Sequence, residues 1–367
     1  MGSLIYLEKP ILPLYLNERG IDVQYSSYLF ATLSLFVMLF APLWGDIGDK
    51  RGRKLVLIVS CFGVGVAQIM FGLATSIWMM IASRALQGIF VSGYAVSFMA
   101  YFNDNSNEEN RSRLISLNLA AIGLGLSLGS LFGGLLSEVM DLESIYMFQG
   151  LSLFLAGYVV YLVYPKYTVH IDIKRQYVFN IFNNIKRVYL MGLLPGMFLT
   201  MTFSMGVYVI VNFLEFYLSS VNFSVLQIGG YVFGMGIVGV LGNATITHLL
   251  LDRFNEFKLL SVTLLIGGVS LLLTALYPVV GLYSFMLLFA LMYNKFKPIT
   301  TQVIHKRAEE NQGVALGVRE TLIHFGMLIG SVVGGFLIKS PLNIFYFSAI
   351  VMFLCAAGFD VLRRLSE

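Results

Sequence analysis

The sequence predicts an all-α integral membrane protein, and three properties lead to that fold class. Hydrophobic residues make up 57% of the 367 residues, and the mean hydropathy is +0.80. Charged residues make up only 12%, about half of the roughly 25% that soluble domains carry. The chain also contains a series of apolar runs that reach the length needed to cross a bilayer as a helix, about 20 residues.

Twelve such runs are predicted to be transmembrane helices, because a lipid-exposed backbone must satisfy its own hydrogen bonds. The predicted spans, in chain order, are 1–17, 26–48, 54–75, 77–102, 113–137, 143–164, 190–218, 225–250, 258–277, 281–304, 313–338 and 342–362.

The lysines and arginines are distributed unevenly over the two sides of these helices. Most of the 24 lie after even-numbered helices, in the central linker or near the C-terminus, whereas the opposite loops hold only Arg19 and Lys339. The positive-inside rule therefore predicts that both termini and the linker are cytoplasmic. The remaining cations fall inside predicted helices: Lys9, Arg84, Lys295, Lys297 and Arg319.

The longest polar interruption, residues 165–189, divides the chain into two predicted six-helix bundles, 1–164 and 190–367. The basic end of this cytoplasmic linker is expected to form an amphipathic helix on the membrane surface. The two cysteines lie in apolar runs, so no disulfide framework is predicted.

The two halves repeat one another. Glu108–Asn110 recurs as Glu309–Asn311, and the six residues that start at Gly129 recur from Gly330, both at an offset of 201 residues. The segment from Ile145 then matches the segment from Ile344 after a two-residue change in loop length. Parallel repeats predict two bundles related by an axis along the membrane normal.

The repeat makes the first helix unusual. Leu14–Leu16 aligns with Phe216–Leu218 at an offset of 202 residues. Since the seventh helix is predicted to start near residue 190, the first is expected to be truncated. Either its real start lies upstream of Met1, or the helix is unusually short.

The loop between the second and third helices reads GDIGDKRGRK from residue 45. It resembles the major facilitator signature GxxxD(R/K)xG(R/K)(R/K), which implies a fold of two six-helix bundles and a role for the loop as a conformational latch. The alternative is an ordinary positively charged cytoplasmic loop. The matching positions are Gly45, Asp49, Lys50, Gly52, Arg53 and Lys54.

Two further segments resemble motifs of this superfamily. Arg84–Gly88 is similar to RxxQG, whose arginine is linked to proton transfer, although an arginine near a helix end can instead reach the headgroups. The fifth helix resembles the exporter motif GxxxGPxxGG with Ser130 in place of the proline, and generic close packing of small residues is the alternative. Its glycines are Gly125, Gly129, Gly133 and Gly134.

Charged residues inside helices are the candidates for coupling and substrate binding, because they are costly in a membrane. Glu8 and Arg84 are each placed roughly 10–14 Å from the outer ends of their helices, so they are expected to form an ion pair or proton site. The adjacent Lys9 points about 100° away and competes for that role.

A second group is predicted nearer the cytoplasmic side, on the tenth and eleventh helices. Lys295, Lys297, Arg319 and Glu320 share one depth, and only one of the two lysines can face the cavity squarely. His324 shares a helix face with Glu320. A self-neutralising structural cluster is the alternative, and His324 is as well explained by packing. Glu215, near the outer end of the seventh helix, is expected to be wetted.

These features predict a secondary transporter that is not an enzyme, because no catalytic triad, P-loop or metal-ligand spacing is present. The resemblance is to the drug/proton antiporter (DHA1-like) branch, which implies proton-coupled efflux of a small amphiphilic molecule by alternating access. Alternatives are export of an anionic metabolite, such as a siderophore or lipid-linked sugar, or a non-transporting receptor or sensor. The expected partners are a small molecule, protons and the bilayer, with no nucleic acid and no cofactor. We expect a multi-pass monomer of the cell membrane.

Overall fold

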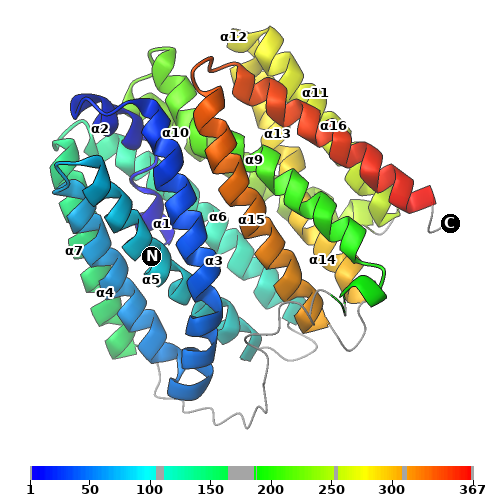
Figure 1. Ribbon diagram of the computed structural model, residues 1–367, viewed down its shortest axis with the longest axis horizontal. Helices are drawn as coiled ribbons and strands as arrows, with labels where there is room; N and C mark the ends of the chain where they lie inside the picture. Colours follow the sequence, from blue (N-terminus) through cyan, green and yellow to red (C-terminus); the bar gives the residue numbers. More distant parts are fainter. Residues whose placement is uncertain are drawn as a thin grey trace. The chain divides into compact units, whose positions relative to one another are not determined.

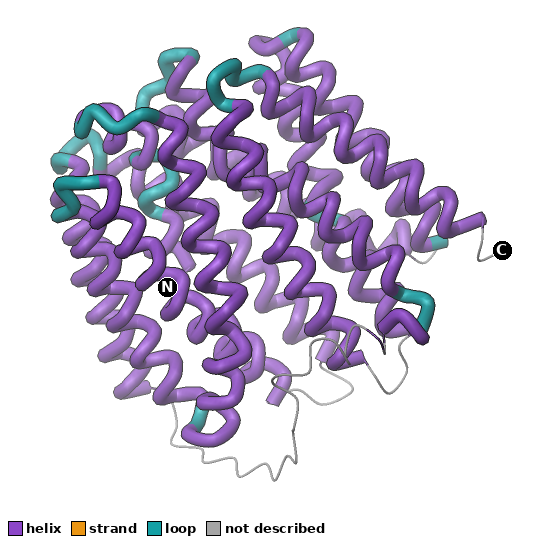
Figure 2. The backbone as a smooth tube through the Cα atoms, in the orientation of Figure 1, coloured by secondary structure: helices purple, strands orange, loops and turns teal. Residues whose placement is uncertain are grey.

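The computed structural model describes residues 2–104, 111–163, 186, 188–251, 255–307 and 312–364, and these residues form helices and connecting loops without strands (Figures 1 and 2). The predicted all-α fold is confirmed. Within the described ranges, nine segments are long and apolar enough to cross a membrane.

The long helices match the predicted spans closely. Those of the first half are α3 (Ser26–Arg51), α4 (Arg53–Gly72), α5 (Ile77–Asp104), α6 (Arg111–Leu136) and α7 (Leu142–Val163). Those of the second half are α9 (Leu194–Ser220), α10 (Val225–Leu251), α11 (Glu256–Leu276), α15 (Gln312–Leu337) and α16 (Asn343–Arg364). A 3₁₀ turn, η1 (Val23–Tyr25), precedes α3.

The first predicted span is not one helix. It consists of α1 (Gly2–Tyr6) and α2 (Leu12–Glu18), separated by a turn over residues 7–11. Pro10 lies in this turn, where it has no N–H to donate and disfavours helix for the residue before it. The prediction of a continuous helix over 1–17 was therefore wrong, and the break places Glu8 in the turn.

The tenth predicted span is also interrupted. It is preceded by α12 (Pro278–Val280) and contains the π-helical turn η2 (Gly281–Phe285), α13 (Met286–Tyr293) and most of α14 (Phe296–Arg307). Pro298 follows the break between α13 and α14, and its ring would collide with the carbonyl four residues earlier in a regular helix. The break at residues 294–295 separates Lys295 from the helix that carries Lys297.

The chain packs into two compact units: Met1–Phe179 with Val221–Phe233, and Asn180–Ser220 with Gly234–Glu367. In the first unit α5 packs against α3 and α4, α4 also packs against α7, and α1 lies against α6 (Figure 1). In the second unit α9 contacts α15 and α16, and α11 lies beside α16 (Figure 1).

Matching contacts recur within the two units at the offsets of the sequence repeat. A Cβ on Gly129 would collide with the carbonyl of Ser3, and one on Gly330 with that of Met205. Gln149 donates to the carbonyl of Leu4 on α1, and Ser348 donates to that of Gly206 on α9 over 2.7 Å.

An aromatic pair repeats in the same way. The ring centroids of Tyr15 and Tyr146 are 4.8 Å apart, and those of Tyr217 and Phe345 are 4.9 Å apart. The internal repeat is thus present in the packing as well as in the sequence.

Two predictions fall mostly outside the described residues. These are the amphipathic helix of the linker 165–189 and the repeated acidic segments 108–110 and 309–311. They remain predictions.

Candidate functional site

The turn between α1 and α2 points the Glu8 side chain toward α5. The carbonyl of Glu8 accepts the N–H groups of Ile11 and Leu12 at 3.1 and 3.0 Å, which fixes the turn. Glu8 Oε1 then lies 2.6 Å from Nη1 of Arg84. Both residues are buried, with exposed fractions of 8% and 2%, so the expected Glu8–Arg84 ion pair is present.

Arg84 has two further partners. Its Nη1 also donates to Oε1 of Gln87, one turn along α5, and its guanidinium lies 4.1 Å from the ring centroid of Phe71 on α4. The charge of Arg84 is therefore held by a carboxylate, an amide and an aromatic face.

Three further buried polar residues of the first unit were not predicted from the sequence: Gln68 on α4, and Tyr146 and Gln149 on α7. Tyr146 packs against Phe71 with ring centroids 5.0 Å apart, and Gln149 reaches the carbonyls of Leu4 and Ile5 on α1. Each is an uncharged polar residue isolated within an apolar run. That isolation is the signal that would have found them, since buried polar groups need partners.

Several buried atoms of the ion pair and of these three residues have no hydrogen-bond partner among the described residues. They are Glu8 Oε2, Arg84 Nε and Nη2, both terminal atoms of Gln68, the Tyr146 hydroxyl and Gln149 Oε1. Such groups are costly when they are left unsatisfied. The region therefore retains donors and acceptors that water or a polar ligand can use.

Lys9 does not join the pair. Its Nζ lies 5.5 Å from the ring centroid of Phe30 on α3, in agreement with the expected divergence of adjacent side chains. Of the two candidates in the turn, Glu8 is the one that contacts Arg84.

The second predicted group forms a cluster around Glu320 on α15. Glu320 Oε1 lies 2.7 Å from Nη2 of Arg319 and 3.3 Å from Nζ of Lys297 on α14. Arg319 also donates to the hydroxyl of Thr301 over 2.6 Å. We call Lys297, Thr301, Arg319 and Glu320 the Glu320 cluster.

Exposure separates this cluster from the Glu8–Arg84 pair. The side chains of Lys297 and Glu320 are 48% and 38% exposed within the protein, and only Arg319 is buried, at 4%. His324, one turn further along α15, has a buried Nδ1 with no hydrogen-bond partner in the described part of the chain.

Lys295 lies apart from the Glu320 cluster. It is fully buried, and its Nζ donates to the carbonyl of Gly242 on α10 over 3.1 Å. Of the two lysines, Lys297 is therefore the one that joins the acid, because the break between α13 and α14 gives the two side chains separate surroundings.

The exposure of Glu215 differs from the prediction. We expected it to be wetted, but it is only 4% exposed, because this part of α9 packs against α15 and α16 within its own unit. In the part of the chain that the structure describes, no group of three or more His, Cys, Asp or Glu side chains could hold a metal ion.

The signature loop joins α3 and α4 through Gly52, whose φ of +93° is unfavourable for other residues. Asp49 pairs with Arg53 across this turn, and Lys50 pairs with Asp46 over 2.7 Å. Gly45 faces Val96 of α5, where a Cβ would meet it at 3.7 Å. The loop is thus a compact ion-paired turn, with Lys54 Nζ 5.3 Å from the ring centroid of Tyr161.

The glycines of α6 serve close packing. Gly129 and Gly133 lie against the carbonyls of Ser3 and Leu7, and Gly134 lies against the backbone of Leu226 on α10. This row of glycines, which begins at Gly125 in the sequence, lets α1 and the turn that carries Glu8 approach α6.

Comparisons with known proteins agree with this architecture. The family described as the Major Facilitator Superfamily matches residues 6–308. A multidrug resistance protein MdtG from Proteus mirabilis is 26% identical over 96% of this chain and 90% of that protein. MdtG from Yersinia enterocolitica is 31% identical, but the match spans only 42% of this chain and 38% of that protein.

Two solved structures share the fold. The human organic anion transporter MFSD10 (TETRAN) has a TM-score of 0.69 at 18% identity, over 98% of this chain and 96% of that one. A variant of the nucleoside transporter NupG has a TM-score of 0.75 at 15% identity, over 98% and 94%.

Proposed function

The chain belongs to the major facilitator superfamily, and we propose that it exports a small amphiphilic molecule in exchange for protons, with Glu8 as the proton-carrying group. The observation that carries the proposal is the buried Glu8–Arg84 ion pair in a helix break. The names of the MdtG relatives, which designate multidrug resistance proteins, support the substrate class. Alternating access of the two halves would move the substrate.

The ion pair offers a physical basis for coupling. Protonation of Glu8 removes the charge that balances Arg84, and an unbalanced buried charge costs about 3–5 kcal/mol. A conformation that admits water or a substrate to Arg84 lowers that cost, so proton binding favours it. The unsatisfied atoms of Gln68, Arg84 and Tyr146 would bind polar atoms of the substrate or of water in that conformation.

The Glu320 cluster is assigned a secondary role. Its acid is shared by two cations and is more exposed than Glu8. When Glu320 is protonated, solvent can therefore compensate the positive charge of its partners better than it can compensate Arg84. We propose that Lys297, Arg319 and His324 tune substrate binding, and that the Asp49 turn acts as the latch implied by the family signature.

A second candidate substrate is an anionic metabolite, such as a siderophore or a lipid-linked sugar. The observation that favours it is the excess of buried cations, since Arg84, Lys295 and Arg319 are each at most 3% exposed. The same proposal places the protein in the cell membrane as a monomer, with both termini cytoplasmic.

Transport in everted vesicles tests the proposal. Efflux of lipophilic cations and of carboxylate metabolites is measured with and without a pH gradient, for the wild type and for Glu8→Gln. We expect gradient-driven transport of a lipophilic cation that Glu8→Gln abolishes, whereas Glu138→Gln, which removes an exposed acid, leaves it intact. Movement of carboxylates alone selects the anionic alternative, and no gradient-dependent movement of either class refutes the antiporter.

A further inference from the structure

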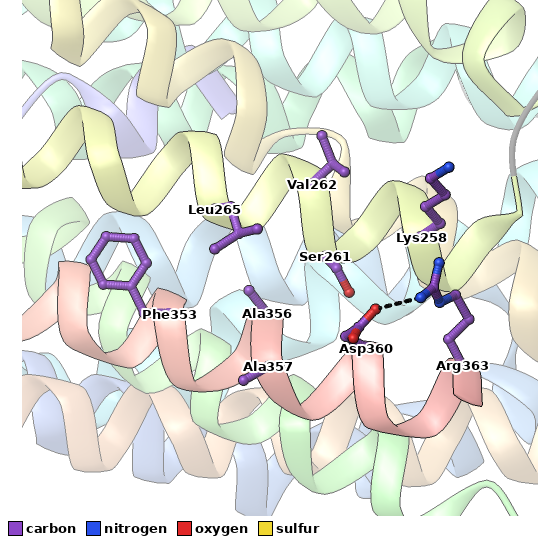
Figure 3. A pocket seen from close by; sticks show the side chains of 9 residues that line it. All are labelled: Lys258, Ser261, Val262, Leu265, Phe353, Ala356, Ala357, Asp360 and Arg363. Atoms are coloured by element: carbon purple, nitrogen blue, oxygen red, sulfur yellow. Dashed lines mark ion pairs between the residues drawn. The ribbon is translucent and has the colours of Figure 1, made fainter. Parts of the chain in front are cut away.

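A groove with a volume of ≈ 400 Å³ runs along α11 and α16 in the second unit (Figure 3). One end is polar and is lined by Lys258, Asp360 and Arg363. The other end is apolar and includes Val262, Leu265 and Phe353. Both helices are predicted to span the membrane, so we expect the exposed groove between them to contact lipid.

The polar end carries excess positive charge. Arg363 and Arg364 both pair with Asp360, at 3.0 and 2.9 Å. Lys258 is exposed and forms no ion pair with a residue that the structure describes. Figure 3 shows the Lys258 and Arg363 side chains at the same end of the groove. A phosphate placed there would meet two cations while Asp360 keeps its partner Arg364.

The spacing along the helices fits the dimensions of a phospholipid. Lys258 and Leu265 are seven residues apart on α11, and Arg363 and Phe353 are ten apart on α16, which correspond to about 10 and 15 Å of helix rise. Val262 and Leu265 are 43% and 46% exposed, so they remain available to an acyl chain.

The corresponding helix pair of the first unit, α4 and α7, is packed differently. Gly65 faces Phe154 there as Gly268 faces Phe353 in the second unit. Phe62 stacks on Phe154 with ring centroids 5.4 Å apart. The offset between the two glycines places Leu265 at the position of Phe62, and the smaller side chain leaves a channel between the helices.

We infer that the α11–α16 groove binds one anionic phospholipid, whose phosphate lies between Lys258 and Arg363 and whose acyl chain lies along Leu265 and Phe353. The predicted orientation places the beginning of α11 and the end of α16 at the cytoplasmic face, so the lipid belongs to that leaflet. Charge complementarity selects an anionic headgroup over a zwitterionic one.

Electron spin resonance with spin-labelled lipids tests this inference without any transport measurement. The full-length protein is reconstituted in phosphatidylcholine, and the relative association of spin-labelled phosphatidylglycerol and phosphatidylcholine is measured. We expect the wild type to prefer phosphatidylglycerol, and Lys258→Gln to lower that preference about five-fold at its site, as expected from the loss of one interfacial cation.

Two further variants isolate the groove. Lys339→Gln removes a cation from the predicted outer loop and should leave the preference unchanged. Ala357→Trp adds bulk at an exposed position that lines the groove, and should release the lipid while the protein stays folded. An unchanged preference in Lys258→Gln, or an equal decrease in Lys339→Gln, would overturn the inference, and neither result bears on proton-coupled export.

Discussion

In the first half of the chain, the carboxylate of Glu8 and the guanidinium of Arg84 are almost fully buried, whereas in the second half Glu320 is 38% exposed and is shared by two cations. At the offsets of the repeat, Glu8 and Arg84 correspond to Ile210 and Phe285. The helix contacts around these positions are repeated, but the charges are not. The duplicated helices therefore provide a common frame, and we propose that the charges of each half serve a separate task.

The first helical region of each half also differs in its continuity. The second half has an unbroken α9 of 27 residues, whereas the matching region of the first half is divided into α1 and α2 around Glu8. Broken helices in transporters place backbone and charge at binding sites. We therefore propose that the break in the first half and its buried acid form one functional feature.

The largest expected effect is that of Arg84→Met. This change leaves the Glu8 carboxylate buried without its partner, so we expect a loss of about 3–5 kcal/mol in stability and no gradient-driven transport. Urea or thermal unfolding in detergent measures the first, and vesicle efflux the second. A loss below about 1 kcal/mol, the range of exposed pairs, would contradict the account.

The double variant Glu8→Ile with Arg84→Phe gives the first half the residues of the second. Since a buried ion pair can be replaced by apolar residues at little cost, most of the stability lost in Arg84→Met should return. Transport should remain absent. Retained transport in this variant would remove the ion pair from the mechanism.

The glycine contacts should respond unequally in the two halves. Gly330→Ala pushes a Cβ into the backbone of the long α9, so we expect it to cost about 1–3 kcal/mol. Gly129→Ala meets α1, which ends at Tyr6 in the turn that carries Glu8, so a shift of α1 at this turn should lower the cost. Unfolding of the two variants in parallel measures the difference, and an equal or larger cost at Gly129 would argue against a movable α1.

Glu320→Gln should have a smaller effect than any change at the Glu8–Arg84 pair. Glu320 is partly exposed, and Lys297 is exposed as well, so we expect a change in stability of at most about 1 kcal/mol and a change in substrate affinity. Concentration-dependent efflux measures that affinity. If Glu320→Gln abolished coupling and Glu8→Gln kept it, Glu320 would be the proton-carrying group and the Glu8–Arg84 pair would have the secondary role.

Most of the fold could be predicted because helix length, apolar content and the distribution of cations are properties of the linear sequence and do not depend on which helices contact one another. The eleven spans after the first lie where they were expected, apart from the irregular segments around Gly281 and Lys295. Both missed breaks lie beside prolines, Pro10 and Pro298, so local sequence contained that signal.

The candidate site was predicted only in part. The Glu8–Arg84 pair followed from the depth of two charged residues, and the link between Lys297 and Glu320 followed from shared depth. Gln68, Tyr146 and Gln149 were missed because only charged residues were taken as candidates, although an uncharged polar residue within an apolar run also needs a buried partner. The choice between Lys295 and Lys297 depended on the helix break, which periodicity does not show.

The central claim is that Glu8 exchanges the coupling proton, and infrared difference spectroscopy tests it most directly. Spectra of the reconstituted protein are recorded across steps in pH, and the carbonyl stretch of a protonated carboxyl group is followed. We predict that this band is lost in Glu8→Gln and kept in Glu320→Gln. A band that is unchanged in Glu8→Gln and lost in Glu320→Gln would contradict the account.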